Sequence, residues 1–349
     1  MIDFDPFLHK LESEPKRSVS IPSLIPTRFI ALFALSFLAL IGFSSKKGTD
    51  AIAAMPSQHN IQLNTTSEIP TEPVERDPLF NSPSEFKERA LPKLDKVTLL
   101  KDENGVYVKS LPSFDSRFAG KIAGLTPKNE FVFYTLDPFL QDYVSSTIRS
   151  SRSKHIAIVV MDPKTGRILA ADGRSPSIKN VWSHAGFPAA SLFKVITAAA
   201  AIENKGVEPE SLISFRGGNY SLGANNYKPN ARLDNRRMTI GEAMGKSCNP
   251  VFGRIALEML NPKILRQYSK LFGFNSDVNC DIPLSPSLAS IPEEDYGLSR
   301  TGAGFGDVTI SPVHAAAIMA GIANKGQMLR PTFIDRVVSP TGVVTYRTK

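Results

Sequence analysis

The stretch 187–206, FPAASLFKVITAAAAIENKG, sets the architecture of this chain and contains its first reactive pair. Pro188 precedes a run of strong helix formers that stops at Gly206, which predicts a helix with Ser191 in its first turn. Lys194 lies one turn further on, on the same face as Ser191. The run is apolar almost all round, so we expect this helix to be buried.

A serine and a lysine placed in this way can serve as a nucleophile and its base. The N-terminus of a helix offers unpaired N–H groups and the positive end of the dipole, which stabilise an oxyanion. A desolvated lysine has a lowered pKa and can take the proton of the hydroxyl. The alternative is a buried helix with an incidental serine. The S-x-x-K spacing alone does not decide, because it also occurs at Ser13, Ser44, Ser84 and Ser151.

A second motif, Ser247-Cys248-Asn249, is the only S-x-N in the chain. It falls between two predicted helices. The first opens with a capping box formed by Thr239 and Glu242, and Pro250 suits the first turn of the second. Asn249 by itself could be a helix cap, which is the structural alternative to a role in catalysis.

The order of predicted elements is that of an α+β protein. A strand at 131–136 precedes a helix capped by Asp137 and running to about residue 148, and a β-hairpin over 155–174 turns at 162–166. Helices dominate from 190 to 325, and a final hairpin follows over 333–346. A sheet interrupted by a large helical insert is therefore expected.

The two motifs in this order resemble the penicillin-binding proteins and their serine β-lactamase relatives, whose set is S-x-x-K, S-D-N and K-T-G. Three further stretches resemble the transpeptidase domain in the same order. They are TLDPFLQ at 135–141, VVMDPKTGRILA at 159–170 and GAGFGDVTISPVHAAAIMAGIANKG at 302–326. The resemblance covers 131–349. No glycosyltransferase-like region precedes it, so the layout is closer to the monofunctional, class B-like members.

The resemblance implies a serine β-lactamase/D,D-peptidase-like fold, with an antiparallel sheet flanked by helices. It implies a peptidoglycan D,D-transpeptidase whose nucleophile, Ser191, is acylated by a D-Ala-D-Ala stem peptide or by a β-lactam. Lys194 would be the general base, Ser247 would relay the proton to the leaving amine, and Asn249 would hold the substrate amide. A D,D-carboxypeptidase, a β-lactamase and a non-catalytic membrane-anchored relative remain alternatives. A cell-wall synthesis complex is a further candidate partner.

The third motif of this family is not found where the resemblance requires it. Residues 164–166 spell K-T-G, but they precede Ser191 and belong to the predicted hairpin turn. Residues 300–302 (R-T-G) belong to the glycine-rich lead into the 311–325 helix. The family would place the strand beyond Lys349. We therefore expect the chain to end before the domain does, with a sheet incomplete at its C-terminus, as a fragment or degenerate copy of an active parent.

The N-terminal part predicts a membrane anchor. Residues 29–43 are an uncharged run of 15 residues, FIALFALSFLALIGF, so we predict a cytoplasmic leader at 1–28 and a transmembrane signal anchor at 29–45. The excess of Lys and Arg before the run places the catalytic domain on the outer, periplasmic side of the cytoplasmic membrane. A signal peptide cleaved near Ala53 is the alternative. Residues 46–130 would be a tether and a small module with a hairpin over 96–109.

Composition limits the remaining classes of function. The net charge of +8 is scattered, which suits anionic lipid or an anionic wall polymer, and no nucleic-acid partner is expected. The two cysteines predict free thiols, with a single bridge as the alternative. No cofactor or metal is expected, because the five histidines show no ligand spacing. They are His9, His59, His155, His184 and His314.

Overall fold

The computed structural model describes residues 74–80, 94–102 and 105–348. The predicted leader, the predicted anchor and the tether up to residue 73 lie outside these ranges. Among the described residues, no helix is both long and apolar enough to traverse a bilayer.

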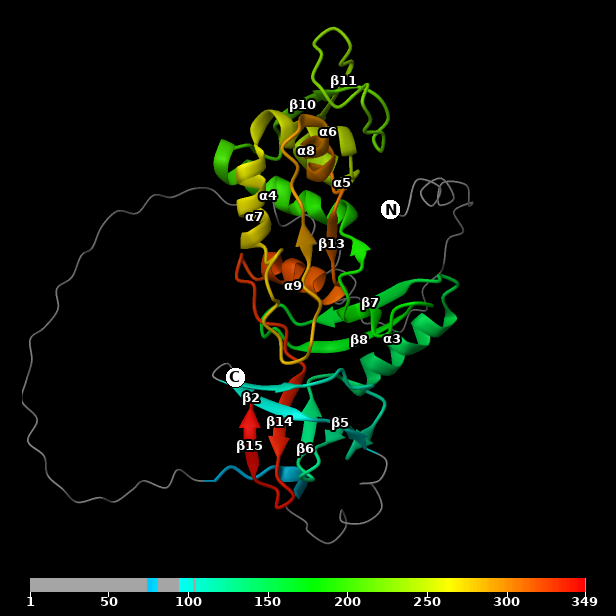
Figure 1. The fold of residues 1–349 in the computed structure, drawn as a ribbon, viewed down its shortest axis with the longest axis vertical. Coiled ribbons are helices and arrows are strands. Elements are labelled where there is room, and N and C mark those ends of the chain that lie inside the picture. Colours follow the sequence, from blue (N-terminus) through cyan, green and yellow to red (C-terminus); the bar gives the residue numbers. More distant parts are fainter. Residues whose placement is uncertain (1–73, 81–93, 103–104, 349) are drawn as a thin grey trace, which may run out of the picture. The chain divides into compact units, whose positions relative to one another are not determined.

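The largest sheet has six strands and joins segments far apart in the sequence (Figure 1). Its order is β1-β5-β6-β14-β15, and β4 pairs with β5. The strands are β1 (Asp95–Lys96), β4 (Arg117–Phe118), β5 (Lys121–Leu125), β6 (Phe131–Tyr134), β14 (Ile334–Val338) and β15 (Val344–Arg347). The pairs are antiparallel except β1 with β5. The predicted strand at 131–136 and the predicted hairpin at 333–346 are both present.

The domain boundary that we placed at residue 130 falls between two paired strands. β5 is hydrogen-bonded to β6, and Ala123 and Leu125 of β5 pack with Phe131 and Phe133 of β6 in one cluster that includes Val338. The predicted hairpin at 96–109 is β2 (Leu99–Asp102) with β3 (Gly105–Val108).

A second sheet is the hairpin β7 (Ile156–Met161) with β8 (Ile168–Arg174). Its turn lies at 162–166, as predicted. Alternate residues of β7 serve opposite faces, as the period of two of a strand requires. Ile156, Ile158 and Val160 pack with helix α3 (Pro138–Ser150), and the residues between them join the core that contains Val313 of α9 (Pro312–Ala323). Asp137 caps α3 through the Leu140 N–H at 2.9 Å.

The helical insert is centred on α4 (Phe193–Lys205). Around it lie α5 (Ile240–Gly245), α6 (Asn249–Arg254), η6 (Ile255–Met259, a π-helix), α7 (Pro262–Leu271) and α8 (Asp295–Gly302). Fully buried Phe193 and Ile196 of α4 pack in one core with Val251 and Phe252 of α6. Gly206 ends α4 in the left-handed conformation, with φ of 60°. Two small sheets complete the insert, β10 (Leu212–Phe215) with β11 (Arg236–Thr239), and β12 (Leu288–Ala289) with β13 (Val308–Ile310) and β9 (Phe187–Pro188).

Two polar side chains, the part-buried Thr135 and the buried Asp281, connect these parts. The Thr135 hydroxyl lies 2.7 Å from the Ile168 carbonyl of β8 and 2.9 Å from the Thr332 carbonyl that leads into β14. Asp281 accepts from the N–H groups of Phe333 and Ile334, each at 2.8 Å. The fold is α+β, with the sheets and the helical insert in the predicted order.

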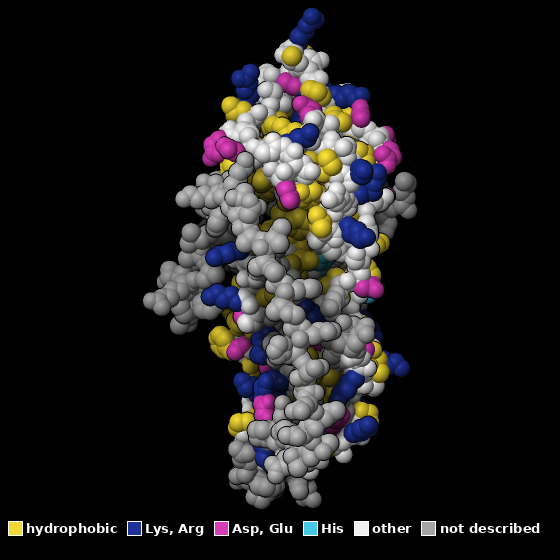
Figure 2. All heavy atoms as spheres, turned by 90° about the vertical axis from the view of Figure 1, so that its left-hand side faces the viewer, with side chains coloured by type: hydrophobic (Ala, Val, Ile, Leu, Met, Phe, Trp, Pro, Cys, Tyr) yellow, Lys and Arg dark blue, Asp and Glu magenta, His cyan; other side chains and the backbone are white. Residues whose placement is uncertain are grey.

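Surface charge is mixed. On the described part of the face shown in Figure 2, Lys and Arg side chains are spread among acidic and apolar ones, and no continuous basic stripe is seen there.

Candidate active site

Ser191 lies in the 3-10 turn η5 (Ala190–Leu192) that leads directly into α4. The turn is approached closely by the segment before β13. A Cβ on Gly304 would come within 1.9 Å of the Ala190 carbonyl oxygen, and Gly304 has φ of +94°. The Ala189 N–H donates to the Val308 carbonyl at 2.9 Å. Backbone contacts to a second element therefore hold the predicted nucleophile in place.

Lys194 is the centre of the polar contacts at this site. Its side chain is buried, with 1% of the residue exposed. The Nζ atom lies 2.8 Å from Ser191 Oγ, 3.2 Å from Ser247 Oγ and 2.7 Å from Asn249 Oδ1. An ammonium has three N–H donors, so these three oxygens match its full capacity.

Ser247 lies between α5 and α6 in an unfavourable backbone conformation. Its φ is +53°, a region that few residues other than glycine adopt. The Ser247 hydroxyl donates to Ser191 Oγ at 2.7 Å, so the two hydroxyls and the amine of Lys194 contact one another. Strain of this kind persists only where surrounding contacts over-determine it, and it concentrates at functional sites.

Asn249 is the first residue of α6, and the structure excludes the helix-cap alternative for it. The cap position is Cys248, and no side chain caps this helix. The Asn249 side chain instead accepts from Lys194 and donates to the Tyr220 carbonyl at 2.8 Å. Cys248 is fully buried in the helical core, and both cysteines are free thiols.

Sequence reasoning missed the segment that supports Asn249. Besides the contact to Tyr220, the Asn249 N–H donates to the Asn219 carbonyl at 2.6 Å. Both acceptors are backbone oxygens, which leave no signature in residue type. The sequence offered only the turn residues Gly217, Gly218 and Asn219 as a sign of a tight loop, and Gly217 has φ of +86° in the structure.

Burial lowers the pKa of Lys194 from its ordinary value to about 8, with the nearby Cys248 thiol acting weakly in the opposite direction. An amine with this pKa is neutral in roughly a tenth of molecules at pH 7. The geometry and the electrostatics together allow Lys194 to take a proton from either hydroxyl.

The two sequences that resemble a third motif lie in other settings. Lys164–Gly166 form the β7–β8 turn, where the Thr165 hydroxyl donates to Asp162 Oδ2 at 2.7 Å. Arg300, Thr301 and Gly302 are the end of α8, and Thr301 is buried.

Three comparisons show which known proteins the chain is similar to. A family model described as "Penicillin binding protein transpeptidase domain" matches residues 156–349, more than half of the chain. The peptidoglycan D,D-transpeptidase PbpA of Mycobacterium tuberculosis is 26% identical over 268 residues, 65% of this chain and 53% of PbpA. Stage V sporulation protein D of Bacillus subtilis is 26% identical over 227 residues, 59% of this chain and 35% of that protein. The chain thus spans about half or less of the length of these relatives.

Solved structures agree on the fold. Penicillin-binding protein A from M. tuberculosis, solved as a penicillin G acyl-enzyme complex, superposes with a TM-score of 0.52 and 23% identity, over 65% of this chain and 58% of that one. The D,D-transpeptidase domain of a peptidoglycan glycosyltransferase from Eggerthella lenta gives a TM-score of 0.52 at 19% identity, over 72% of each chain.

Proposed function

Because the chain belongs to the penicillin-binding protein transpeptidase domain family, we propose that it cross-links peptidoglycan stem peptides through an acyl-enzyme on Ser191. One observation carries the proposal. The buried amine of Lys194 lies within hydrogen-bond distance of Ser191, Ser247 and Asn249, although these residues come from two separate segments of the chain.

Acylation follows from these contacts. Neutral Lys194 takes the proton of the Ser191 hydroxyl as Oγ attacks the carbonyl carbon of the penultimate D-alanine. The oxyanion develops at the N-terminal end of α4, where the positive end of the helix dipole stabilises negative charge. Ser247 donates its proton to the amine of the leaving D-alanine as the C–N bond breaks, and it takes in exchange the proton that Lys194 received, across 3.2 Å. The ester on Ser191 is the acyl-enzyme.

Deacylation reverses the roles. The amine of a second stem peptide attacks the ester carbon, and its proton passes through the same groups back to Ser191 Oγ. A new amide forms and the serine is released. Asn249 holds the substrate amide in place throughout, through a side chain that is itself fixed by Lys194 and the Tyr220 carbonyl.

A β-lactam would enter the same path and remain as a stable ester. The relative in M. tuberculosis with a penicillin G acyl-enzyme supports this choice of inhibitor. We also propose that residues 29–45 anchor the chain in the cytoplasmic membrane with the domain on the outer side. The uncharged run and its basic flanks support that placement.

The test is labelling of the full chain with fluorescent penicillin, beside a Ser191→Ala variant. We expect covalent labelling of the wild-type chain and none of the variant. A folded wild-type chain that takes up no label would overturn the proposal and favour a non-catalytic relative.

A further inference from the structure

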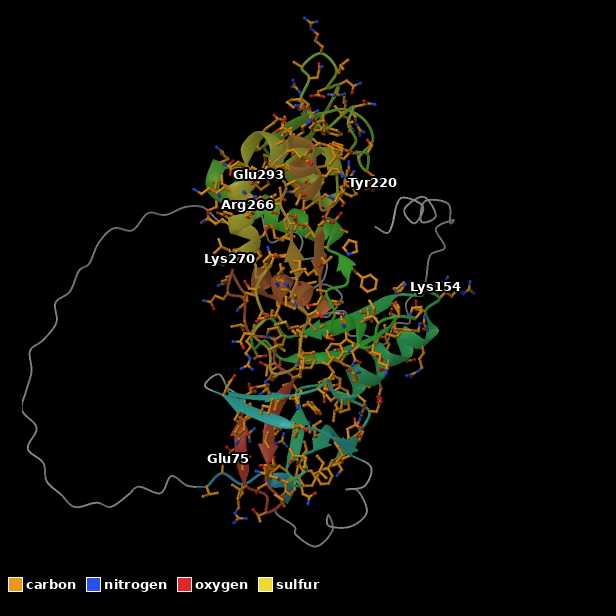
Figure 3. The ribbon with its side chains drawn as sticks, viewed as in Figure 1. Glu75, Lys154, Tyr220, Arg266, Lys270 and Glu293 are labelled. Atoms are coloured by element: carbon orange, nitrogen blue, oxygen red, sulfur yellow. The ribbon has the colours of Figure 1, made fainter. Side chains whose placement is uncertain are left out.

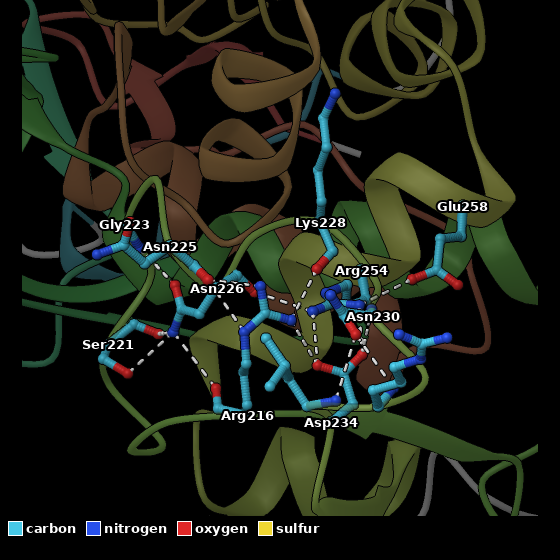
Figure 4. Close-up of polar contacts among 12 residues, drawn as sticks. Arg216, Ser221, Gly223, Asn225, Asn226, Lys228, Asn230, Asp234, Arg254 and Glu258 are labelled. Carbon is cyan, nitrogen blue, oxygen red and sulfur yellow. Dashed lines mark hydrogen bonds and ion pairs between the residues drawn. The ribbon is translucent and has the colours of Figure 1, made fainter.

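A cluster of charged side chains, drawn in Figure 4, contacts the loop 216–235. This loop connects β10 to β11 and is hydrogen-bonded to Asn249, the first residue of α6. The centre of the cluster is the carboxylate of Asp234, whose side chain is 4% exposed. Arg254, at the other end of α6 from Asn249, has a side chain only 1% exposed and contacts both carboxylate oxygens, at 3.0 and 3.2 Å. Arg216 contacts Asp234 Oδ1 at 2.7 Å.

Each member of the cluster also binds loop backbone. The Asp234 carboxylate accepts from the Asn230 N–H at 2.8 Å. Arg254 donates to the Asn226 carbonyl at 3.0 Å, and Arg216 donates to the carbonyls of Asn225 and Lys228. Desolvation disfavours the charged form of Asp234, but the hydrogen bonds from Asn230, Arg216 and Arg254 outweigh it and hold the pKa of this carboxyl below its usual value. The carboxylate of Asp234 therefore stays ionised at neutral pH.

The same loop supplies the two carbonyls that hold Asn249. The Asn226 side chain donates to the Ser221 carbonyl at 3.1 Å and accepts from the Gly223 N–H at 2.7 Å, so it fixes the tight bend that presents residues 219–221. Tyr220, whose exposed side chain is labelled in Figure 3, then receives the Asn249 side-chain amide on its carbonyl. Both ends of helix α6 are therefore hydrogen-bonded to the loop, through Asn249 at its first residue and through Arg254 at its last.

We propose that Asp234 and Arg254 are positioning residues for the acyl-transfer site, which fix Asn249, and through it Lys194, by clamping the loop 216–235 onto α6. This inference rests on the proposed function only for its catalytic consequence. Whether Asp234 and Arg254 hold the loop 216–235 on α6 can be measured in any folded form of the chain, active or not.

Removing one partner is the sensitive change. Asp234→Asn keeps the size of the side chain but removes the closer of two counter-charges of the buried Arg254 and leaves the partly exposed Glu258, 3.6 Å away. A buried charge that loses most of its pairing is costly. Opening of the loop lowers this free-energy cost most easily, because water then reaches the guanidinium. Opening withdraws the Tyr220 and Asn219 carbonyls and frees Asn249.

The experiment is amide hydrogen exchange, resolved by peptide, on the full chain carrying Asp234→Asn. We expect exchange at the Asn249 amide and across 216–226 to quicken about tenfold or more, while α7 and β14 keep wild-type rates. The matched control is Lys228→Ala in the same loop. It breaks an ion pair with Asp295 of α8, in which both side chains are more than half exposed. It should leave exchange unchanged.

A second, milder variant keeps the test valid if Asp234→Asn fails to fold. Arg216→Met removes the partly exposed member of the cluster, and we expect a smaller increase confined to the same peptides. Wild-type exchange at 216–226 and Asn249 in both variants, or an equal rise in α7 and β14, would overturn the clamp.

Acylation by penicillin gives the catalytic readout. We expect Asp234→Asn to slow the acylation step about tenfold at saturating penicillin, with half-saturation little changed, and Arg254→Lys to recover part of the rate lost in Arg254→Met. An acylation step as fast in Asp234→Asn as in wild type, despite faster exchange, would overturn the positioning role. If the wild-type chain takes no label, the proposed function is wrong. The hydrogen-exchange result by itself then decides whether Asp234 and Arg254 hold the loop on α6.

Discussion

Lys194 is the residue that contacts all three of the other predicted catalytic residues. Few lysines are fully buried without an acidic partner, and this one faces two hydroxyls and an amide oxygen. Neutral acceptors satisfy its N–H donors but do not compensate its charge. That is why burial lowers its pKa to about 8 and no neighbouring carboxylate raises it.

The pH dependence of acylation follows from that pKa. The neutral amine is the base, so the rate should rise with pH through a midpoint near 8. Between pH 7 and pH 9 the neutral fraction grows roughly tenfold, and the acylation step should follow it. Stopped-flow acylation of the full chain by penicillin from pH 6 to pH 10 measures this. A flat profile would show that Lys194 is not the base.

A carboxylate at position 249 should move that midpoint. Asn249→Asp places a negative charge against the Lys194 ammonium, which favours the charged form and raises the pKa by about 1–3 units. It also turns the donor facing the Tyr220 carbonyl into an acceptor. We expect acylation at pH 7.5 to fall about tenfold or more, with the midpoint above pH 9.

The control for this change is Asn204→Asp, the same substitution at an exposed residue of α4, whose amide donates to the Ala200 carbonyl. It should keep the wild-type profile. A slower Asn249→Asp enzyme with an unmoved midpoint would mean that Asn249 acts on substrate only, and not on the lysine.

At the scale of elements, the turn that carries Ser191 depends on one close approach. Ala190 has φ of +47°, and its carbonyl faces the Cα of Gly304, which precedes β13. A side chain at 304 cannot be accommodated without moving the backbone immediately before the nucleophile.

Gly304→Ala should therefore reduce both stability and acylation. We expect a loss of about 2–4 kcal/mol in the free energy of unfolding, from a strained φ and a clash with backbone. The matched control is Gly326→Ala, where φ is +88° but a Cβ would meet nothing within 4 Å. It should cost about 1 kcal/mol and leave acylation unchanged. Urea unfolding and penicillin labelling of both variants test this, and equal losses would show that φ alone matters.

At the scale of the whole molecule, a few buried polar groups add to the apolar packing that holds the described sheets and helices together. Asp281 is 1% exposed and receives the N–H groups of Phe333 and Ile334 on its side chain, while its carbonyl receives the Val108 N–H of β3 at 2.9 Å. Burial raises its pKa to about 6, against the hydrogen bonds from Ile334 and Phe333. One residue of the insert thus joins the hairpin β2–β3 to the central strand β14.

Asp281→Ala should destabilise the whole folded unit. It leaves two buried N–H donors without an acceptor, at about 1–3 kcal/mol each, so we expect a total loss of about 2–5 kcal/mol. Asp277→Ala, an exposed aspartate in the same segment, is the control and should change stability by less than about 0.5 kcal/mol. Urea denaturation followed by circular dichroism measures both. A loss no larger than that of the control would mean that the sheet is held by apolar packing alone.

Local sequence patterns were sufficient to predict several turns, caps and helix ends. The turn at 162–166, the cap at Asp137 and the stop of α4 at Gly206 follow from side chains that act on their own neighbours. The structure agrees with each of these predictions because nothing distant competes with them. The same reasoning predicted that Ser191 and Lys194 are neighbours within one helix. The two side chains are in contact, but Ser191 lies in the 3-10 turn that precedes α4 and not in its first turn.

The sequence by itself determined which residues carry reactive groups and on which elements they lie. Only the tertiary structure decided that Ser247 and Asn249 reach Lys194, that Asn249 is a bridge and not a cap, and that Asp234 and Arg254 hold the loop behind it. The reason is physical. Contacts between distant segments depend on packing of the whole core, and contacts to backbone carbonyls, such as those of Tyr220 and Asn219, leave no trace in residue type.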